Sequence, residues 1–208
     1  MTYDVQKRLL DVVSATTLII AFLPFWIIIP LLIVLDSGWP VMFQHKRVGK
    51  GGQEFYINKF RSMIPGAHEL LHKKNKELLK KFKKGDWKIA AKDDPRITRL
   101  GRILRSLTID EFPQLFNVLR GEMSMVGPRA YMKSELNEQT KKHPETRPYI
   151  KKILTIKPGV TGPWQTSGRN EIPFAKRAEM DAKYADNRSL WTDVKILFKT
   201  PRAMISKW

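Results

Sequence analysis

The sequence predicts an α+β fold, mainly helical, in which a re-entrant membrane helix–break–helix precedes one compact domain. Three observations predict it: a long uncharged apolar run near the N-terminus, two strand-like segments around a glycine turn, and two later segments with apolar side chains on one helical face. The chain has 208 residues, which leaves room for a single domain after the apolar run. We therefore expect a membrane hairpin over residues 1–40 and a membrane-associated domain over residues 41–208.

The apolar run, residues 12–35, contains no charged side chain and exceeds the ~20 apolar residues that cross a bilayer as a straight helix. Pro24 lies near its middle, where it removes a backbone donor and clashes with the preceding turn. Basic side chains flank the run on both sides: Lys7, Arg8, Lys46, Arg47 and Lys50. Because both flanks are basic, the positive-inside rule draws both to the cytoplasmic side. A chain that bends at Pro24 and returns satisfies both ends; a kinked single span is the alternative.

Short-range patterns place the other elements. Residues 41–47 and 54–60 are rich in aromatic and β-branched residues and flank a glycine-rich turn, which predicts a small β-hairpin. Residues 69–84 place leucines on one side of a helix and lysines over the rest, and residues 190–198 place apolar side chains at i, i+1, i+4, i+7 and i+8. We expect both to be amphipathic interfacial helices, with Trp191 at the headgroup level. Packing on the core of the domain is the alternative for both.

The composition narrows the class of partner. The net charge of +18 suits phosphate-rich partners, either nucleic acid or an anionic membrane with phosphorylated ligands. Each basic group near an anionic bilayer contributes ~1 kcal/mol to binding. With a membrane segment present, we expect anionic lipids and no nucleic acid. The chain has no cysteine, which excludes a disulfide framework and a thiolate metal site and is compatible with a reducing cytoplasm.

One motif resembles a zinc site. His68, Glu69 and His72 fit the pattern H-E-x-x-H, in which two histidines on one helix face bind zinc and the glutamate acts as a base. A catalytic zinc needs a third ligand, and the other histidines are only His45 and His143. Many lysines follow the motif, and their positive field opposes cation binding. We expect no specific zinc here, so a zinc hydrolase is a remote alternative.

A pair of adjacent carboxylates, Asp110 and Glu111, stands just before Pro113. Proline is tolerated only near the start of a helix, so the pair is predicted at a helix N-terminus, where Thr108 and Glu111 would form a capping box. Helix capping alone would explain the pair. Arginines surround it along the chain, however: Arg96, Arg99, Arg102, Arg105 and Arg129. Adjacent carboxylates can hold Mg²⁺ beside a phosphorylated substrate, and a carboxylate can attack phosphorus to form an acyl phosphate. A site of phosphoryl transfer is therefore the second reading of the pair.

Five short motifs follow the apolar run in a fixed order. They are Lys59-Phe60-Arg61-Ser62-Met63, residues 105–115, residues 125–129, residues 157–162, and Ser167-Gly168-Arg169-Asn170. In this order they resemble the bacterial sugar transferase family, the monotopic phosphoglycosyl transferases that begin the assembly of surface polysaccharides and glycoconjugates. The resemblance covers about residues 7–198. It implies an enzyme at the cytoplasmic face of the bacterial inner membrane, which moves a sugar 1-phosphate from a UDP-sugar to undecaprenyl phosphate and releases UMP.

The resemblance also implies roles for single residues. Asp110 would attack the β-phosphorus and form a covalent phosphosugar, while Asp110 and Glu111 would hold the Mg²⁺ cofactor. Five basic residues would bind phosphate: Lys59, Arg61, Arg105, Arg129 and Arg169. Two positions depart from the family pattern. Leu23 stands before Pro24 where the family often has serine, and Ala130 follows Arg129 where the family has proline.

The sequence leaves the sugar, the polysaccharide pathway and the oligomeric state open. The insertion at residues 65–92 and the context of Trp164 and Gln165 resemble those of family members that use a hexose donor, such as UDP-glucose or UDP-galactose, more than those of members that use an acetamido sugar. A membrane-tethered module that binds anionic lipids or nucleic acid is the alternative function. Such a module would explain the charge and the hairpin but not the two carboxylates among arginines.

Overall fold

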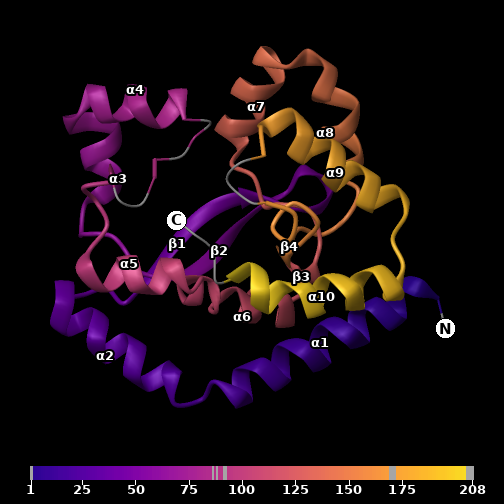
Figure 1. The fold of residues 1–208 in the computed structure, drawn as a ribbon, viewed down its shortest axis with the longest axis horizontal. Helices are drawn as coiled ribbons and strands as arrows, with labels where there is room; N and C mark the ends of the chain where they lie inside the picture. The colour runs from indigo at the N-terminus through magenta and orange to yellow at the C-terminus, as the bar shows by residue number, and fades with distance from the viewer. Residues whose placement is uncertain (1, 86, 88, 91–92, 169–171, 205–208) are drawn as a thin grey trace. The chain divides into compact units, whose positions relative to one another are not determined.

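The computed structural model describes residues 2–85, 87, 89–90, 93–168 and 172–204, and Figure 1 shows the order of its helices and strands. The chain forms two compact units that alternate along the sequence. Unit 1 comprises Met1–Phe22, Gln44–Asn58 and Pro113–Ala203, and unit 2 comprises Leu23–Phe43, Lys59–Phe112 and Met204–Trp208. The structure is mainly helical, as predicted. The division of the chain after residue 40 stays a prediction.

The predicted break at Pro24 is present. Helix α1 (Tyr3–Ala21) ends before it, and α2 (Phe25–Ser37) begins directly after it. Proline is tolerated at this place because the start of a helix offers no intrahelical acceptor for the missing N–H group. Among the described residues, no single helix is long and apolar enough to cross a membrane. Helices α1 and α2 meet that criterion only together, as a bent pair, and by length and composition alone.

The predicted β-hairpin is confirmed. Strands β1 (Met42–Val48) and β2 (Glu54–Phe60) form a two-stranded sheet, and the short 3₁₀ turn Lys50–Gly52 connects them. Gly51 and Gly52 have φ angles of 71° and 78°, a left-handed conformation that side chains disfavour. Glycine is therefore required for this tight connection.

Unit 1 is built around a short parallel sheet and the helices that follow it. Strands β3 (Ser124–Val126) and β4 (Gly159–Thr161) pair with Ser124 opposite Gly159 and Val126 opposite Thr161. The helices after α1 are α6 (Gln114–Leu119), α7 (Lys133–Lys142), α8 (Arg147–Ile153), α9 (Phe174–Asp186) and α10 (Leu190–Met204). A 3₁₀ turn, Pro144–Thr146, links α7 to α8. The main core cluster comprises Val48, Tyr131, Leu136, Ile150, Ile153, Phe174, Ala178 and Ala182.

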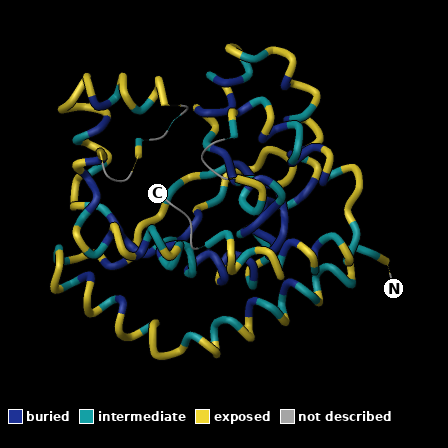
Figure 2. The backbone as a smooth tube through the Cα atoms, in the orientation of Figure 1, coloured by how far each residue is buried: buried dark blue, intermediate teal, exposed yellow. Residues whose placement is uncertain are grey.

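Unit 2 packs α2 against α5 (Arg99–Ser106). Its core cluster comprises Ile29, Ile33, Val41, Phe60 and Leu104, and Trp26 lies against it with its ring centroid 5.5 Å from that of Phe60. Many of the other side chains of α2 are apolar and exposed, and Figure 2 shows exposed positions along this helix. The exposed large side chains of α2 are Phe25, Ile27, Ile28, Leu31, Leu32 and Leu35. Such a contiguous apolar surface is unusual for a protein surrounded by water.

The prediction of one continuous helix over residues 69–84 is wrong. The structure has α3 (Ala67–Glu69), a π-helical turn (Leu70–Lys74) and α4 (Lys76–Lys84). The reason is Asn75, whose extended backbone interrupts the helix and whose side chain accepts a hydrogen bond from Leu78 N at 2.8 Å.

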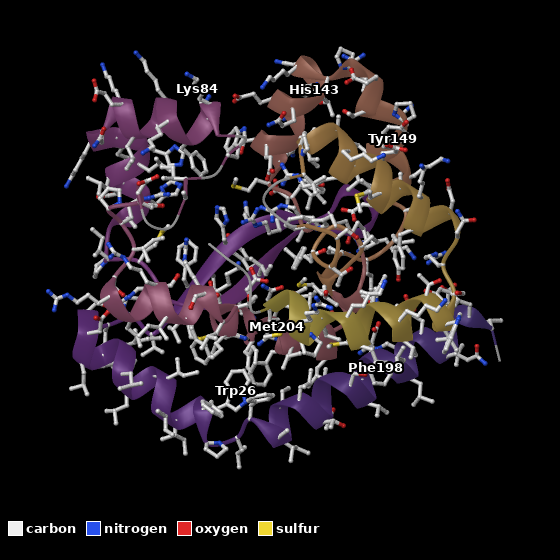
Figure 3. The ribbon with its side chains drawn as sticks, in the orientation of Figure 1. Trp26, Lys84, His143, Tyr149, Phe198 and Met204 are labelled. Atoms are coloured by element: carbon white, nitrogen blue, oxygen red, sulfur yellow. The ribbon has the colours of Figure 1, made fainter. Side chains whose placement is uncertain are left out.

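The apolar side of α4 packs within unit 2. The ring of Phe82 lies 5.6 Å from that of Trp87 and 5.6 Å from the guanidinium of Arg96. Figure 1 shows α4 on the other side of unit 2 from α2, with α5 between them, and Figure 3 shows Lys84 and other basic side chains pointing away from α4. Core packing, the alternative reading of this segment, accounts for its apolar side.

The C-terminal helix is present as predicted and is longer than its apolar pattern. Helix α10 continues to Met204, with Pro201 inside it. Ile196 is buried, whereas Trp191 and Phe198 are 66% and 83% exposed. Figure 3 labels Phe198 on α10. The exposed aromatic side chains are compatible with a place at the membrane interface, which stays a prediction.

Candidate active site

The two adjacent carboxylates lie in a turn before the helix, not in its first turn. Asp110 and Glu111 belong to the 3₁₀ turn Ile109–Glu111, and α6 begins only at Gln114, with Pro113 at its N-cap. The predicted capping box is wrong. Thr108 has a left-handed backbone with φ of 58° and makes no side-chain capping hydrogen bond; its hydroxyl donates to Met204 O at 3.3 Å. The two carboxylates are thus held by a strained turn rather than by helix capping.

Asp110 is a buried carboxylate, with 5% of its surface exposed. Burial raises the pKa of Asp110 to about 6, because the charged form loses its hydration. The positive charge of Lys59 opposes this rise in pKa, Glu111 adds to it, and Arg105 opposes it. The site therefore contains a carboxylate whose ionised form depends on nearby cations.

Glu111 is paired with Lys59. The Lys59 ammonium donates to Glu111 Oε1 at 2.5 Å, and both side chains are only partly exposed. Lys59 lies near the end of the hairpin strand β2, so two segments more than fifty positions apart meet here. The ion pair thus joins strand β2 to the turn that carries the two carboxylates.

Arg105 is held in the same unit by the motif that contains Lys59. Its Nε donates to Ser62 Oγ at 2.8 Å. Helix α5, which carries Arg105, approaches this motif closely: a Cβ atom at Gly101 would overlap the backbone carbonyl of Ser62. The structure thus brings together four predicted site residues, Asp110, Glu111, Lys59 and Arg105.

Arg61 contacts a different feature of unit 2, the C-terminal end of α2. Its Nη2 donates to Ser37 Oγ at 2.8 Å and to Gly38 O at 2.5 Å. A guanidinium at this end stabilises carbonyl groups that have no intrahelical donor. Arg61 is buried, and its Nε and Nη1 have no hydrogen-bond partner among the described residues. The structure gives Arg61 a helix-capping contact; its binding of phosphate stays a prediction.

Arg129 belongs to unit 1, in the loop after β3. Gly127 N donates to Thr161 O at 3.0 Å, and Gly159 N donates to Pro128 O at 2.8 Å, so the motifs at residues 125–129 and 157–162 form one backbone assembly. A Cβ atom at Gly127 would lie 2.6 Å from Lys157 O, which explains why glycine stands there. Arg169, the fifth predicted phosphate ligand, lies outside the described residues.

The surroundings of Arg129 include residues that the sequence did not single out. Arg129 N donates to Asp181 Oδ2 at 3.0 Å, and its guanidinium carbon lies 5.2 Å from the ring centroid of Trp164. The Arg177 guanidinium lies 5.6 Å from the same ring. Arg177 and Asp181 are both buried and sit four positions apart on α9, on the face of Phe174 and Ala178. The sequence offered one indication of these two residues: they are charged but occupy core positions of an otherwise apolar helix face.

Asp181 is fully buried, and burial raises its pKa to about 7. The hydrogen bond from the Arg129 backbone and the charges of Arg129 and Arg177 oppose this rise in pKa. Between about pH 4 and pH 7 the folded chain therefore keeps a proton that the unfolded chain has lost, so the contribution of Asp181 to stability falls as pH rises through this window.

Asp181→Asn should gain thermal stability relative to the wild type as pH rises from 5 to 8. Asparagine does not titrate and can still accept the Arg129 N–H, so the free energy of unfolding should move in favour of the variant, by at most roughly 4 kcal/mol above pH 7, and its Tm should rise relative to the wild type. The measurement is the Tm of both proteins at four pH values. Asp186→Asn, which changes an exposed carboxylate on the same helix, is the control. A difference in Tm that is the same at pH 5 and pH 8 would contradict the prediction.

The carboxylates also decide which metal ion would fit. Among the described residues, no three His, Cys, Asp or Glu side chains gather as a metal site. Mg²⁺ takes one or two protein carboxylates and completes its shell with water and substrate phosphates. Asp110 and Glu111 offer that number of hard oxygen donors, so the residues fit Mg²⁺ held jointly with a diphosphate. In the H-E-x-x-H segment, the rings of His68 and His72 lie 4.3 Å apart; the absence of zinc there stays a prediction.

Comparison with known proteins connects this arrangement to a family. The family model described as bacterial sugar transferase matches residues 2–207. The chain is 40% identical over 198 residues to a UDP-galactose-lipid carrier transferase of Erwinia amylovora, and 38% identical over 205 residues to an undecaprenyl-phosphate galactose phosphotransferase of Salmonella typhimurium. These matches cover 93% and 97% of this chain but only 39% and 40% of those relatives. The exopolysaccharide production protein ExoY of Rhizobium meliloti is 37% identical, and the match covers 97% of this chain and 86% of that protein.

Proposed function

Because the chain belongs to the bacterial sugar transferase family, we propose that it transfers a sugar 1-phosphate from a UDP-sugar to undecaprenyl phosphate and releases UMP. The observation that carries the proposal is the buried carboxylate of Asp110 beside Lys59, Arg105 and Glu111. A site for phosphoryl transfer needs a nucleophile together with cations that neutralise phosphate oxygens, and these residues supply both. Several relatives are named as undecaprenyl-phosphate sugar phosphotransferases, and these names support the general reaction.

The reaction would proceed in two displacements. In the first, an oxygen of the ionised Asp110 bonds to the β-phosphorus of the donor, the bond from that phosphorus to the bridging oxygen breaks, and UMP leaves with the electron pair. In the second, a phosphate oxygen of undecaprenyl phosphate bonds to the same phosphorus, and the acyl-phosphate bond breaks. Asp110 is regenerated as a carboxylate, and the sugar stays joined to its phosphate throughout.

The surrounding side chains would prepare Asp110 for this attack. Burial disfavours its charged form, whereas the positive charges of Lys59 and Arg105 favour it. Lys59 also holds Glu111 in place through their ion pair. Arg129, fixed by its backbone hydrogen bond to Asp181, would bind donor phosphate with its guanidinium. Mg²⁺, bound by Asp110 and Glu111, would neutralise charge on the diphosphate.

A donor screen tests the function. Purified protein is mixed with undecaprenyl phosphate, Mg²⁺ and one UDP-sugar at a time, and UMP release is followed. We expect more than one UMP per protein only when the acceptor is present, with UDP-glucose or UDP-galactose ahead of acetamido sugars. The relatives do not fix the sugar, since their names include galactose, glucose and N-acetylgalactosamine. Absence of UMP release with every donor, together with binding to anionic vesicles, would favour the non-enzymatic lipid-binding module instead.

We further propose that α1 and α2 enter the bilayer from the cytoplasmic face of the bacterial inner membrane and return to it. The basic flanks support this orientation, and so do the exposed apolar side chains of both helices. On α1 the exposed large apolar residues are Val5, Leu9, Val13 and Ile20. Anionic lipids would bind the basic side chains beside the membrane.

Thiol labelling tests this topology with little background, because the chain has no cysteine. Thr2→Cys and Lys207→Cys should both resist a membrane-impermeant thiol reagent in intact cells, since both termini are expected in the cytoplasm. Both variants should react after the cells are opened, which is the control for accessibility. Labelling of Thr2→Cys alone in intact cells would show a single span and overturn the hairpin.

A further inference from the structure

Helix α1 carries a buried carboxylate in the segment expected to approach the membrane. Asp11 is 3% exposed, although the neighbouring outward positions of the helix are apolar and exposed. Its Oδ1 accepts hydrogen bonds from Lys7 Nζ at 2.7 Å, Ser124 Oγ at 3.0 Å and Met125 N at 2.9 Å. A buried charge is retained only when such partners satisfy it. The inner side of α1 therefore makes a polar contact with strand β3.

A second series of contacts connects α1 to the C-terminal end of strand β3. Lys7 Nζ lies 3.7 Å from Asp193 Oδ2, and Asp193 is fully buried in α10. Asp193 accepts hydrogen bonds from Tyr3 Oη at 3.0 Å and from Tyr184 Oη at 2.5 Å. Tyr184 Oη also lies 3.2 Å from Val126 O, the last residue of β3. Lys7, Asp11 and Asp193 thus join α1 to both ends of β3.

Arg8 adds a third contact from the same helix. Its guanidinium donates to Val118 O at 2.6 Å and to Leu119 O at 2.8 Å. These are carbonyl groups of the last turn of α6, at the negative end of the helix dipole, so a cation there is favourable. Val118 O also accepts a hydrogen bond from Gly121 N at 2.9 Å. The polar contacts of Lys7, Arg8 and Asp11 therefore fix the rotation and the height of α1 against α6, β3 and α10.

Strand β3 leads directly into the loop that carries Arg129. The loop is fixed downstream by the bonds of Gly127 to Thr161 and of Arg129 N to Asp181. Upstream, its position depends on β3, which α1 holds through Ser124 and Met125. A displacement of β3 would therefore displace the Arg129 guanidinium, which the proposed function assigns to donor phosphate.

We propose that Asp11 is a positioning residue for Arg129, so that the first membrane-proximal helix sets the geometry of phosphate binding as well as anchoring the protein. The inference rests on the proposed function. It separates two sets of residues on α1: apolar residues that face outward, such as Leu9 and Val13, and the polar residues Lys7 and Asp11 that hold β3. Anchoring depends on the first set and the position of Arg129 on the second.

A double-mutant cycle tests this role in the full-length protein, with the UDP-sugar that gives the fastest UMP release. Asp11→Ala should lower kcat/KM for the donor by about 10²-fold, the usual cost of misplacing a catalytic contact by about 1 Å. In an Arg129→Ala background the same change should lower it less than about threefold, because no guanidinium is left to misplace. Asp4→Asn, which changes an exposed carboxylate of the same helix, is the control and should leave kcat/KM unchanged.

Two further measurements keep the outcome decisive. Asp11→Asn can still accept from Ser124 and Met125 but loses its ion pair with Lys7, so it should fall between wild type and Asp11→Ala. Amide hydrogen exchange at residues 124–129 should be faster in both Asp11 variants than in Asp4→Asn, while sedimentation with membranes stays the same. Hydrogen exchange does not depend on turnover, so it tests the contact between Asp11 and β3 even if the protein turns over no donor. A lack of turnover with every donor would count against the proposed function alone. Multiplicative losses in the Arg129→Ala background, or unchanged exchange at these residues, would overturn the positioning role.

Discussion

Asp110→Asn should fold as the wild type does and lose transfer activity by about 10⁴-fold or more, the scale seen when an essential member of a catalytic group is replaced. Asparagine has the same shape as aspartate, and a neutral amide costs less to bury than a carboxylate, so the Tm should be equal or higher. An amide, however, is a very poor nucleophile toward phosphorus. The measurement is UMP release per mole of protein under saturating donor and acceptor, alongside the Tm.

The covalent route adds a test that does not depend on the size of the loss. Wild-type protein with donor alone should carry a phosphosugar at residue 110, visible as a mass increase that hydroxylamine removes, because hydroxylamine cleaves acyl phosphates. The initial rates should follow ping-pong kinetics. Near-native turnover in Asp110→Asn, or a ternary mechanism without an adduct, would show that the two carboxylates serve only the local fold.

Glu111→Gln should lower transfer by roughly 10²- to 10³-fold, the range found when one electrostatic contact of a transition state is removed. The change takes one carboxylate from the proposed Mg²⁺ site and leaves the Lys59 ammonium without its anionic partner at 2.5 Å. The Mg²⁺ concentration for half-maximal activity should therefore rise as well as kcat falling. Kinetics at several Mg²⁺ concentrations measure both effects.

A matched control lies on the same strand as Lys59. Glu54 is also a glutamate paired with a lysine, Lys46, at 3.3 Å, but it is outside the site. Glu54→Gln should leave both kcat and the Mg²⁺ dependence unchanged. If Glu111→Gln behaves like Glu54→Gln, then Glu111 has neither a metal-binding nor a charge-placing role.

The parts of the fold that depend on local chemistry could be predicted from the sequence. Pro24 ends one helix and precedes another because a proline has no donor, and the glycine turn at residues 51–52 closes the hairpin because it needs positive φ angles. The helix over residues 69–84 was predicted as continuous because its apolar spacing is regular. The spacing of apolar residues gives no information about capping. The Asn75 side chain caps α4, and the helical turn before it therefore ends.

The candidate site could be predicted only as a set of separate motifs. The spacing of Thr108 and Glu111 matched a capping box, but the left-handed backbone at Thr108 depends on tertiary contacts, one of them with Met204. Arg177 and Asp181 were missed for a related reason. A buried charge makes sense only beside its partner, and the partner of Asp181, Arg129, lies far away along the chain. Sequence motifs therefore supplied the candidate reacting groups, whereas the residues that hold them emerged only from the fold.

The parallel pairing of β3 and β4 has a consequence for synthesis on the ribosome. A parallel pair cannot close until the second strand exists, and here the second strand, Gly159–Thr161, comes more than thirty residues after the first. Lys59, Arg105, Asp110 and Glu111 all precede both strands. A nascent chain synthesised just past Phe112 thus already contains both carboxylates and the cations beside them. The Arg129 loop can form only after β4 and then Asp181 have been synthesised. The proposed nucleophile is made early and the loop proposed to bind phosphate is completed late, so an unfinished chain contains the Asp110 carboxylate before that loop can form.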